Sequence, residues 1–113
     1  MRIDVKGRNF AVDDDLRQRV ERRFEKIARQ VSPVARLEVE LSEERNPSIR
    51  DSSIAEATLY LKGVTLRARD RSDSMAHAIH LAADELTRQV KRHRDKRRAR
   101  RSGAKPEPRP AAP

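Results

Sequence analysis

Arginine and lysine are the residues of this sequence whose number and spacing most clearly indicate a chemistry. The chain has 27 Lys and Arg residues against 18 Asp and Glu residues, which gives a formal net charge of +9. Residues 1–87 hold 16 basic and 16 acidic residues, so the whole excess lies in residues 88–113, with 11 basic and 2 acidic residues. Lys and Arg release the counterions condensed on phosphate. The basic end therefore indicates either a polyanionic partner or a solvated tail that keeps the protein soluble.

Candidate RNA-binding residues lie on two predicted helices. The first helix exposes Arg19, Arg22, Arg23, Lys26 and Arg29 beside its apolar stripe. The second helix exposes Arg88, Lys91, Arg92, Arg94, Lys96, Arg97 and Arg98. Guanidinium groups suit phosphate oxygens because they form paired, charge-assisted hydrogen bonds. If the helices lie side by side, we expect these residues to form one broad cationic surface.

Residues for catalysis or metal binding are scarce in this sequence. It has no cysteine, which excludes disulfides, thiolate zinc sites and thiol nucleophiles. Three widely separated glycines exclude a Gly-rich phosphate loop. His77, His80 and Asp84 share a helical spacing, but without a further Cys or His nearby we interpret them as exposed polar positions. We expect no enzyme, no metal site and no cofactor.

Periodicity predicts the elements that must position the basic residues. Residues 2–7, 35–43, 55–62 and 64–68 alternate apolar and polar residues, as half-buried strands do. Residues 13–15 are three aspartates that suit the start of a helix. The helix that follows carries Leu16, Val20, Phe24, Ile27 and Val31 on one stripe, and we expect it to run about five turns until a proline at position 33 ends it.

A second helix is predicted after the serine-rich segment 72–74. Its apolar stripe ends at Val90, and no helix breaker occurs in residues 91–101, so we expect it to continue beyond the sheet. Residues 102–113 include a glycine and four prolines and are predicted to be a disordered tail. The sequence thus predicts one domain over residues 1–101 and a Pro-rich tail over residues 102–113.

The order of elements predicts the fold class, which is α+β. Strand one and strand two should be parallel through a right-handed crossover, and short connections should make the later strands antiparallel. Both helices carry one apolar stripe, so we expect a two-layer sandwich in which both cover one face of a four-stranded mixed sheet. This β-α-β-β-β-α arrangement is similar to the double-stranded-RNA-binding domain. The outer face carries Tyr60 among Glu38, Glu40 and Glu56, and we expect this acidity to disfavour RNA there.

The second helix resembles the signature helix of the ribosome hibernation promoting factor family, which includes the ribosome-associated inhibitor called protein Y and the sigma-54 modulation proteins. The resemblance covers roughly residues 1–98. Its matching positions are Asp73, Met75, Ala78, Ile79, Leu86, Arg88, Gln89, Val90 and Lys91. His80 stands where the family usually has an acid, and Glu85 stands where a lysine is common, which weakens the basic face at one point. The chain resembles a short-type factor or the N-terminal domain of a long one.

The resemblance implies a function. It implies binding to the small ribosomal subunit, between head and body, where the family contacts rRNA and overlaps the positions of mRNA and tRNA. It implies inhibition of translation by occlusion, without a reaction. The alternatives are a general double-stranded RNA-binding protein or RNA chaperone, and a module whose basic tail binds an acidic protein.

The length and hydropathy of the chain indicate how many domains it has and where in the cell we expect it. A chain of 113 residues fits one small domain. It has no run of 18 apolar residues and no apolar segment at its N-terminus, so the sequence predicts a soluble cytoplasmic protein with no membrane contact. We expect a monomer in solution.

Overall fold

The computed structural model describes residues 1–46 and 48–101. Its elements are β1 (Arg2–Arg8), α1 (Asp14–Arg23), α2 (Glu25–Ala28), β2 (Arg36–Glu43), β3 (Ser53–Leu61), β4 (Val64–Ser72) and α3 (Met75–Arg101). This order confirms the predicted β-α-β-β-β-α arrangement, with the first helix divided into two segments. The tail predicted over residues 102–113 lies outside the described residues, and the domain boundary at residue 101 stays a prediction.

The four strands form one mixed sheet in chain order, β1-β2-β3-β4. β1 is parallel to β2, with Ile3 opposite Leu37, and both later pairs are antiparallel. A parallel pair needs a crossover connection, which α1 and α2 supply. β3 begins two residues before the predicted Ala55, and β4 continues four residues past the predicted Ala68. The reason is that pairing persists from Leu61 opposite Val64 to the far end of the hairpin.

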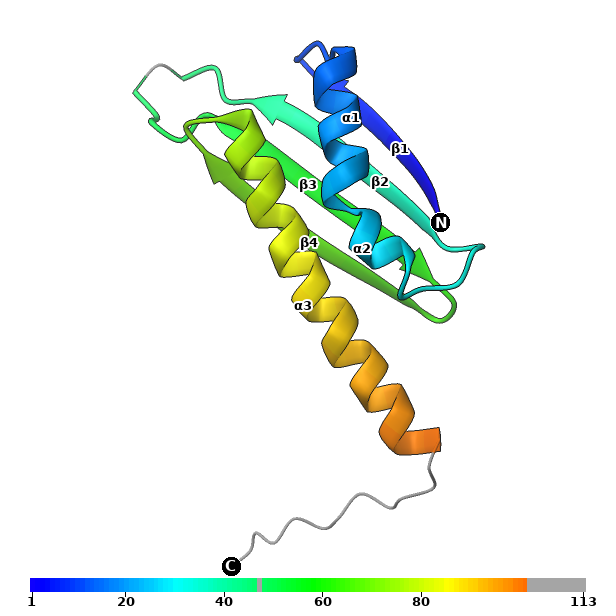
Figure 1. Cartoon of the computed structure of the whole chain (residues 1–113). Helices are drawn as coiled ribbons and strands as arrows, with labels where there is room; N and C mark the ends of the chain where they lie inside the picture. The colour runs from blue at the N-terminus through cyan, green and yellow to red at the C-terminus, as the bar shows by residue number, and fades with distance from the viewer. Residues whose placement is uncertain (47, 102–113) are drawn as a thin grey trace, which may run out of the picture.

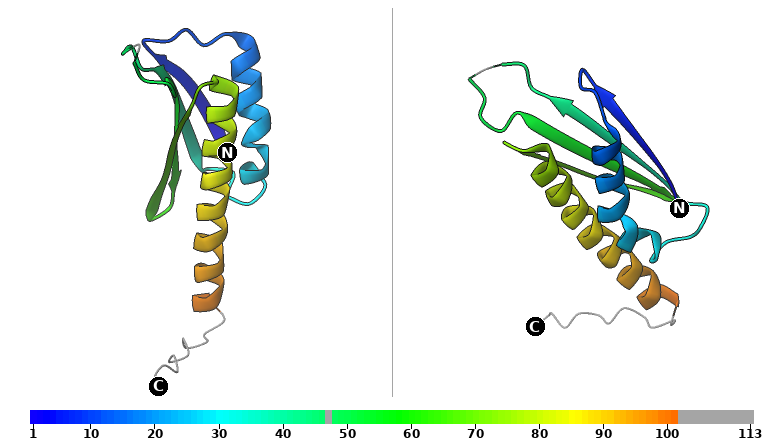
Figure 2. Two further views of the ribbon diagram at one scale, coloured as in Figure 1. Left: turned by 90° about the vertical axis from the view of Figure 1, so that its left-hand side faces the viewer. Right: turned by 45° about the horizontal axis from the view of Figure 1, so that its top comes forward.

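The three helical segments within the described residues cover the same face of the sheet, and none of them lies on the other face (Figures 1 and 2). α1 and α3 begin at the same end of the sheet and lie side by side. The core lies between the two layers, and its largest fully buried side chains include Phe24, Ile27, Leu37, Leu59 and Leu86. Each such side chain contributes roughly 1.5–3 kcal/mol by leaving water. This two-layer packing confirms the predicted α+β sandwich.

The prediction of one continuous five-turn helix up to Pro33 is wrong. α1 begins as predicted, because Asp13 accepts a hydrogen bond from the Leu16 amide at 2.9 Å. The helix then breaks at Phe24, whose backbone leaves helical geometry at ψ 3° while its ring is fully buried. Helical structure ends at Ala28, because the chain needs the following residues to cross to the start of β2.

α3 confirms the predicted continuation beyond the sheet. Ser74 starts the helix, and its hydroxyl accepts a hydrogen bond from the His77 amide at 3.2 Å. Buried positions recur up to Val90, and the remaining turns extend past the end of the sheet (Figure 1). None of the helices that the structure describes is long and apolar enough to cross a membrane.

Two connections of the sheet contain residues with special backbone requirements. At the first, a Cβ added to Gly7 would overlap the carbonyl oxygen of Phe10, so only glycine fits between β1 and the loop. Asn9 then adopts a left-handed conformation with φ 58°. At the second, Gly63 has φ 82° in the two-residue turn between β3 and β4. Gly7 lies inside β1, which continues to Arg8, so the predicted strand end at Gly7 is one residue early.

Candidate nucleic-acid interface

The basic residues of α1 divide between the flank that faces α3 and the rest of the helix surface. Arg17 marks the opposite flank, because its guanidinium lies 3.4 Å from the Val5 carbonyl oxygen on the edge strand β1. Residues three or four apart share a helix face. Arg19 and Arg23 follow this spacing on the side away from Arg17, and Lys26 lies beyond the break at Phe24, four residues before Gln30, whose side chain contacts Arg94. They therefore lie toward α3, next to the helical layer's central seam.

The basic residues of α3 divide between two flanks. One flank faces β4, because the Gln89 side-chain amide donates a hydrogen bond to the Arg67 carbonyl oxygen at 2.8 Å. Arg88, Arg92 and Lys96 belong to that side by helical spacing. The other flank faces the first helix, because Arg94 Nη1 donates to Gln30 Oε1 at 2.9 Å.

By helical spacing, six of the twelve predicted RNA-binding residues lie on the sides of α1, α2 and α3 that face the boundary between the helices. We call this set the interhelical cluster, and it consists of Arg19, Arg23, Lys26, Lys91, Arg94 and Arg98. Arg88, Arg92 and Lys96 lie on the β4 side of α3, whereas Arg22 lies on the outer side of α1. Arg97 projects from the overhanging part of α3, on the line of its buried stripe. The twelve residues therefore surround the helices and do not form one flat surface.

Ion pairing separates the predicted residues further. Arg29 pairs with Glu25 at 3.3 Å, and Arg88 pairs with Glu85 at 2.8 Å. Among the described residues, no ion pair or side-chain hydrogen bond engages nine of the twelve: Arg19, Arg22, Arg23, Lys26, Lys91, Arg92, Lys96, Arg97 and Arg98. These nine cations are available to an external anion.

Glu85 competes for the cations of the β4-facing flank. Hydrogen bonds from Arg88 and then Gln89 lower the pKa of Glu85, so the carboxylate stays ionised. The same hydrogen bond raises the pKa of Arg88 above its ordinary value. On the neighbouring strand, burial and then repulsion by Glu85 raise the pKa of Asp70. The interhelical cluster meets less acidity, since only Arg94 contacts a carboxylate, at 4.0 Å from Asp95.

α3 ends at Arg101, beyond the end of the sheet, and the carbonyl end of its dipole favours cations in its last turn. Arg98 lies in this last turn, so its position is favourable for a cation. The overhang of α3 adds cations without any apolar surface to bury. The basic charge is thus carried on helical backbone up to the last described residues.

The outer face of the sheet is less acidic than the sequence predicted. The predicted glutamates lie there, but only on the central strands β2 and β3. Edge strands add six exposed cations: Arg2, Lys6, Arg8, Arg67, Arg69 and Arg71. In the centre, Arg36 pairs with Glu38 at 3.1 Å and stacks 4.4 Å from the Tyr60 ring centroid. The Tyr60 hydroxyl donates to Glu38 at 3.2 Å, so this aromatic ring is occupied within the fold.

The histidines of α3 form local contacts. His80 lies 3.4 Å from Asp84, and the ring of His77 lies 2.9 Å from the Ser72 hydroxyl. The two rings stack with centroids 6.3 Å apart. Within residues 1–46 and 48–101, no group of three or more His, Cys, Asp or Glu side chains is arranged to hold a metal ion.

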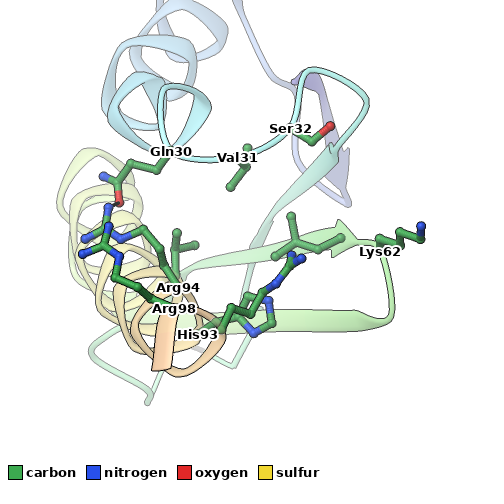
Figure 3. Close-up of a pocket in the computed structure, with 10 residues that line it drawn as sticks. Gln30, Val31, Ser32, Lys62, His93, Arg94 and Arg98 are labelled. Carbon is green, nitrogen blue, oxygen red and sulfur yellow. Dashed lines mark hydrogen bonds between the residues drawn. The ribbon is translucent and has the colours of Figure 1, made fainter. Parts of the chain in front are cut away.

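Sequence reasoning missed a cavity at the end of the helical layer, where the segment after α2, the β3–β4 turn and α3 meet. Figure 3 shows Gln30 reaching toward Arg94 at one side of it. The only signal in the sequence was the spacing of Gln30, which continues the flank of Arg23 and Lys26. Because the helix breaks between α1 and α2 at Phe24, that spacing did not predict where the Gln30 side chain lies.

The chain matches the family model described as sigma 54 modulation protein / S30EA ribosomal protein over residues 3–98. A ribosome hibernation promotion factor of Picosynechococcus is 31% identical over 97 residues, which are 85% of this chain and 50% of that protein. A ribosome hibernation promoting factor of Azotobacter vinelandii is 29% identical, over 94% of each. The chain thus spans about half the length of the first relative and nearly all of the second.

Solved structures show the same fold. The N-terminal domain of Thermus thermophilus Protein Y is 29% identical and superposes with a TM-score of 0.69, covering 82% of this chain and 99% of that one. A ribosomal subunit interface protein from Coxiella burnetii, at 19% identity, has a TM-score of 0.68 over 84% of this chain and 99% of its own. With its predicted element order and its matched residues 3–98, this chain belongs to the sigma 54 modulation protein / S30EA ribosomal protein family.

Proposed function

We propose that this protein is a ribosome hibernation factor that binds the small ribosomal subunit in its mRNA and tRNA channel and inhibits translation by occupying it. The observation that carries the proposal is the interhelical cluster, five of whose six cations make no ion pair among the described residues. The names of the relatives from Picosynechococcus and Azotobacter support the same role.

The geometry suits structured RNA better than bases of a single strand. A-form RNA is recognised mostly by its shape and its backbone, which needs cations at phosphate spacing and no row of exposed aromatic rings. The interhelical cluster supplies cations on helical backbone, and the one tyrosine is held by Arg36 and Glu38. Occupancy of a channel needs shape and charge, and it needs no reacting group.

The partners follow from this role. The protein binds rRNA and ribosomal proteins of the small subunit and competes with mRNA and tRNA for their positions. It acts in the cytoplasm, where ribosomes translate, and it binds as a monomer, because one helical layer presents the whole interhelical cluster.

Cosedimentation with purified small subunits tests the proposal. The variant Arg23→Glu/Lys26→Glu/Lys91→Glu reverses three cations of the cluster, and its binding is expected to weaken by at least about tenfold because three phosphate contacts are lost. The matched control, Arg8→Glu/Arg69→Glu/Arg71→Glu, makes the same charge change on the outer sheet face and is expected to bind like the original chain. Circular dichroism of each variant verifies its fold.

Two results would contradict the proposal. Equal binding by the cluster variant and the original chain would remove the helical layer from the interface. Binding to naked duplex RNA as tight as binding to small subunits would favour the alternative, a general double-stranded RNA-binding protein.

A further inference from the structure

The cavity at the end of the helical layer is the feature that the proposed function does not use. Its volume is about 290 Å³, close to the lower end of the roughly 300–1,000 Å³ found for small-molecule pockets. Three separate parts of the chain line it: residues 30–32 after α2, residues 61–62 at the β3–β4 turn, and α3 from Val90 onward. Figure 3 shows the side chains of these parts around one hollow.

One side of the cavity is apolar. Val31 and Leu61 are half-buried and pack against the core, and Val90 is 2% exposed. His93 also lines the cavity and contributes an aromatic ring. A flat, weakly polar ring that binds on this side would bury one of its faces away from water and lie beside the His93 imidazole.

The other side of the cavity is cationic. Arg94 lines it from one turn of α3, and Arg97 and Arg98 line it from the next. Arg94 is anchored to Gln30 at 2.9 Å, yet its buried Nε makes no hydrogen bond to the residues that the structure describes. Arg97 and Arg98 make no ion pair within those residues. Lys62 stands at the rim, and Figure 3 shows its amine directed away from the hollow.

Charge distinguishes this cavity from the second hollow on α3. That hollow, on the β4 side, has a volume of about 310 Å³ and is lined by Glu85 as well as by Arg92 and Lys96. None of the described residues that line the first cavity carries a carboxylate. An anion is therefore attracted into the first and meets an ionised glutamate in the second.

We propose that the first cavity binds a nucleoside monophosphate unit. The base lies on Val31, Leu61 and Val90 beside the His93 ring, and the phosphate accepts hydrogen bonds from Arg97 and Arg98. Arginine suits this task because its fork binds two phosphate oxygens at once. The unit has two sources, a nucleotide turned out of an RNA strand or a free nucleotide. The first source rests on the proposed function, which brings the helical layer onto RNA.

Amide chemical shifts of the ¹⁵N-labelled full chain, titrated with AMP, test the inference. The expected result is a saturable shift confined to residues 30–32, 61–62 and 90–98. Inorganic phosphate and adenosine, titrated separately, are each expected to bind at least about tenfold more weakly than AMP, because each fills only one side of the cavity. Equal binding of phosphate and AMP would overturn the inference, since the apolar side would then contribute nothing.

Matched variants locate the site. Arg97→Glu/Arg98→Glu is expected to weaken AMP binding by about tenfold or more, since both phosphate ligands are reversed. Arg92→Glu/Lys96→Glu makes the same charge change on the opposite flank of the same helix, and its AMP affinity is expected to change less than about twofold. Equal losses in both variants would contradict a localised site. So would an acidic peptide, hexaglutamate, that binds the cavity more tightly than AMP.

Two further measurements are needed. One identifies the source of the nucleotide, and the other distinguishes a failure of the cavity assignment from a failure of the proposed function. A six-nucleotide single-stranded RNA that shifts the same amides more tightly than AMP identifies RNA as the source, and the reverse order identifies a free nucleotide. Both orders support the cavity's chemistry. If AMP binds as expected while the chain fails to sediment with small subunits, the proposed function fails and the cavity stands. If the chain sediments but AMP causes no shift, only the cavity assignment fails.

Discussion

At position 88 the arginine is held by a neighbour on its own helix, and its residue type alone does not reveal this. The 2.8 Å contact with Glu85 occupies the guanidinium that the sequence assigned to RNA. By contrast, Lys91 lies three residues further on, faces the first helix and makes no ion pair among the described residues. Sequence reasoning found the cations, because type and spacing are visible. It did not find which of them are paired, because pairing depends on the rotamers of both partners.

Replacement of Glu85 is expected to strengthen binding to small subunits. In Glu85→Gln, Arg88 loses its carboxylate partner and becomes available to a phosphate, so the slope of log affinity against log salt is expected to steepen by about 1. The measurement is cosedimentation over a series of salt concentrations. Glu21→Gln makes the same charge change on exposed α1 and serves as the control. An unchanged slope in Glu85→Gln would show that Arg88 does not contact RNA.

Replacement of Asp70 is expected to stabilise the fold at neutral pH. Because burial and Glu85 raise the pKa of Asp70 above 3.8, the folded state holds this proton more tightly than the unfolded chain does. The contribution of Asp70 to the free energy of unfolding is therefore fully present below pH 3.8. It is lost as the pH rises through the raised pKa that Asp70 has in the folded state. Asp70→Asn should raise the Tm at pH 7 and change it little at pH 3. A lower Tm at pH 7, measured by circular dichroism, would contradict this account.

The strands and helices followed from periodicity, and their ends did not. Alternation located all four strands, because each presents an apolar side to the helices. The break at Phe24 was not predictable, because the apolar stripe runs through it without interruption. The structure needs the break so that Phe24 and Ile27 are both buried while the chain turns back toward β2. Tertiary packing thus overrode a regular helical pattern.

Substitution of Gly7, at the connection between β1 and α1, tests how tightly the loop packs against the strand. Gly7→Ala places a methyl group against the Phe10 carbonyl, and backbone must move to accept it. The expected loss is about 1–3 kcal/mol in the free energy of unfolding. Urea denaturation measures it, and Lys6→Ala, an exposed neighbour on the same strand, is expected to change little. A Gly7→Ala protein as stable as the original would show that the loop adjusts freely.

For the whole molecule, the layer order was predictable and the distribution of charge around the layers was not. One apolar side per strand and one stripe per helix require a two-layer sandwich. The sequence also placed the excess of basic charge after residue 87, and α3 carries it past the end of the sheet. Helical spacing without a packed neighbour cannot tell which flank faces β4, and the contacts of Gln89 and Arg94 settled that. The exposed cations of β1 and β4 were also absent from the predicted outer face, although strand alternation alone places them there.

Competition on the small subunit tests the central claim most directly. A fluorescently labelled chain is bound to purified small subunits at moderate salt, and tRNA with mRNA is then added in increasing amounts. Because the account places the chain in the channel that these RNAs occupy, they are expected to displace it completely, and subunits loaded with both are expected to bind no labelled chain. Binding to loaded subunits as tight as to empty ones would contradict occlusion of the channel.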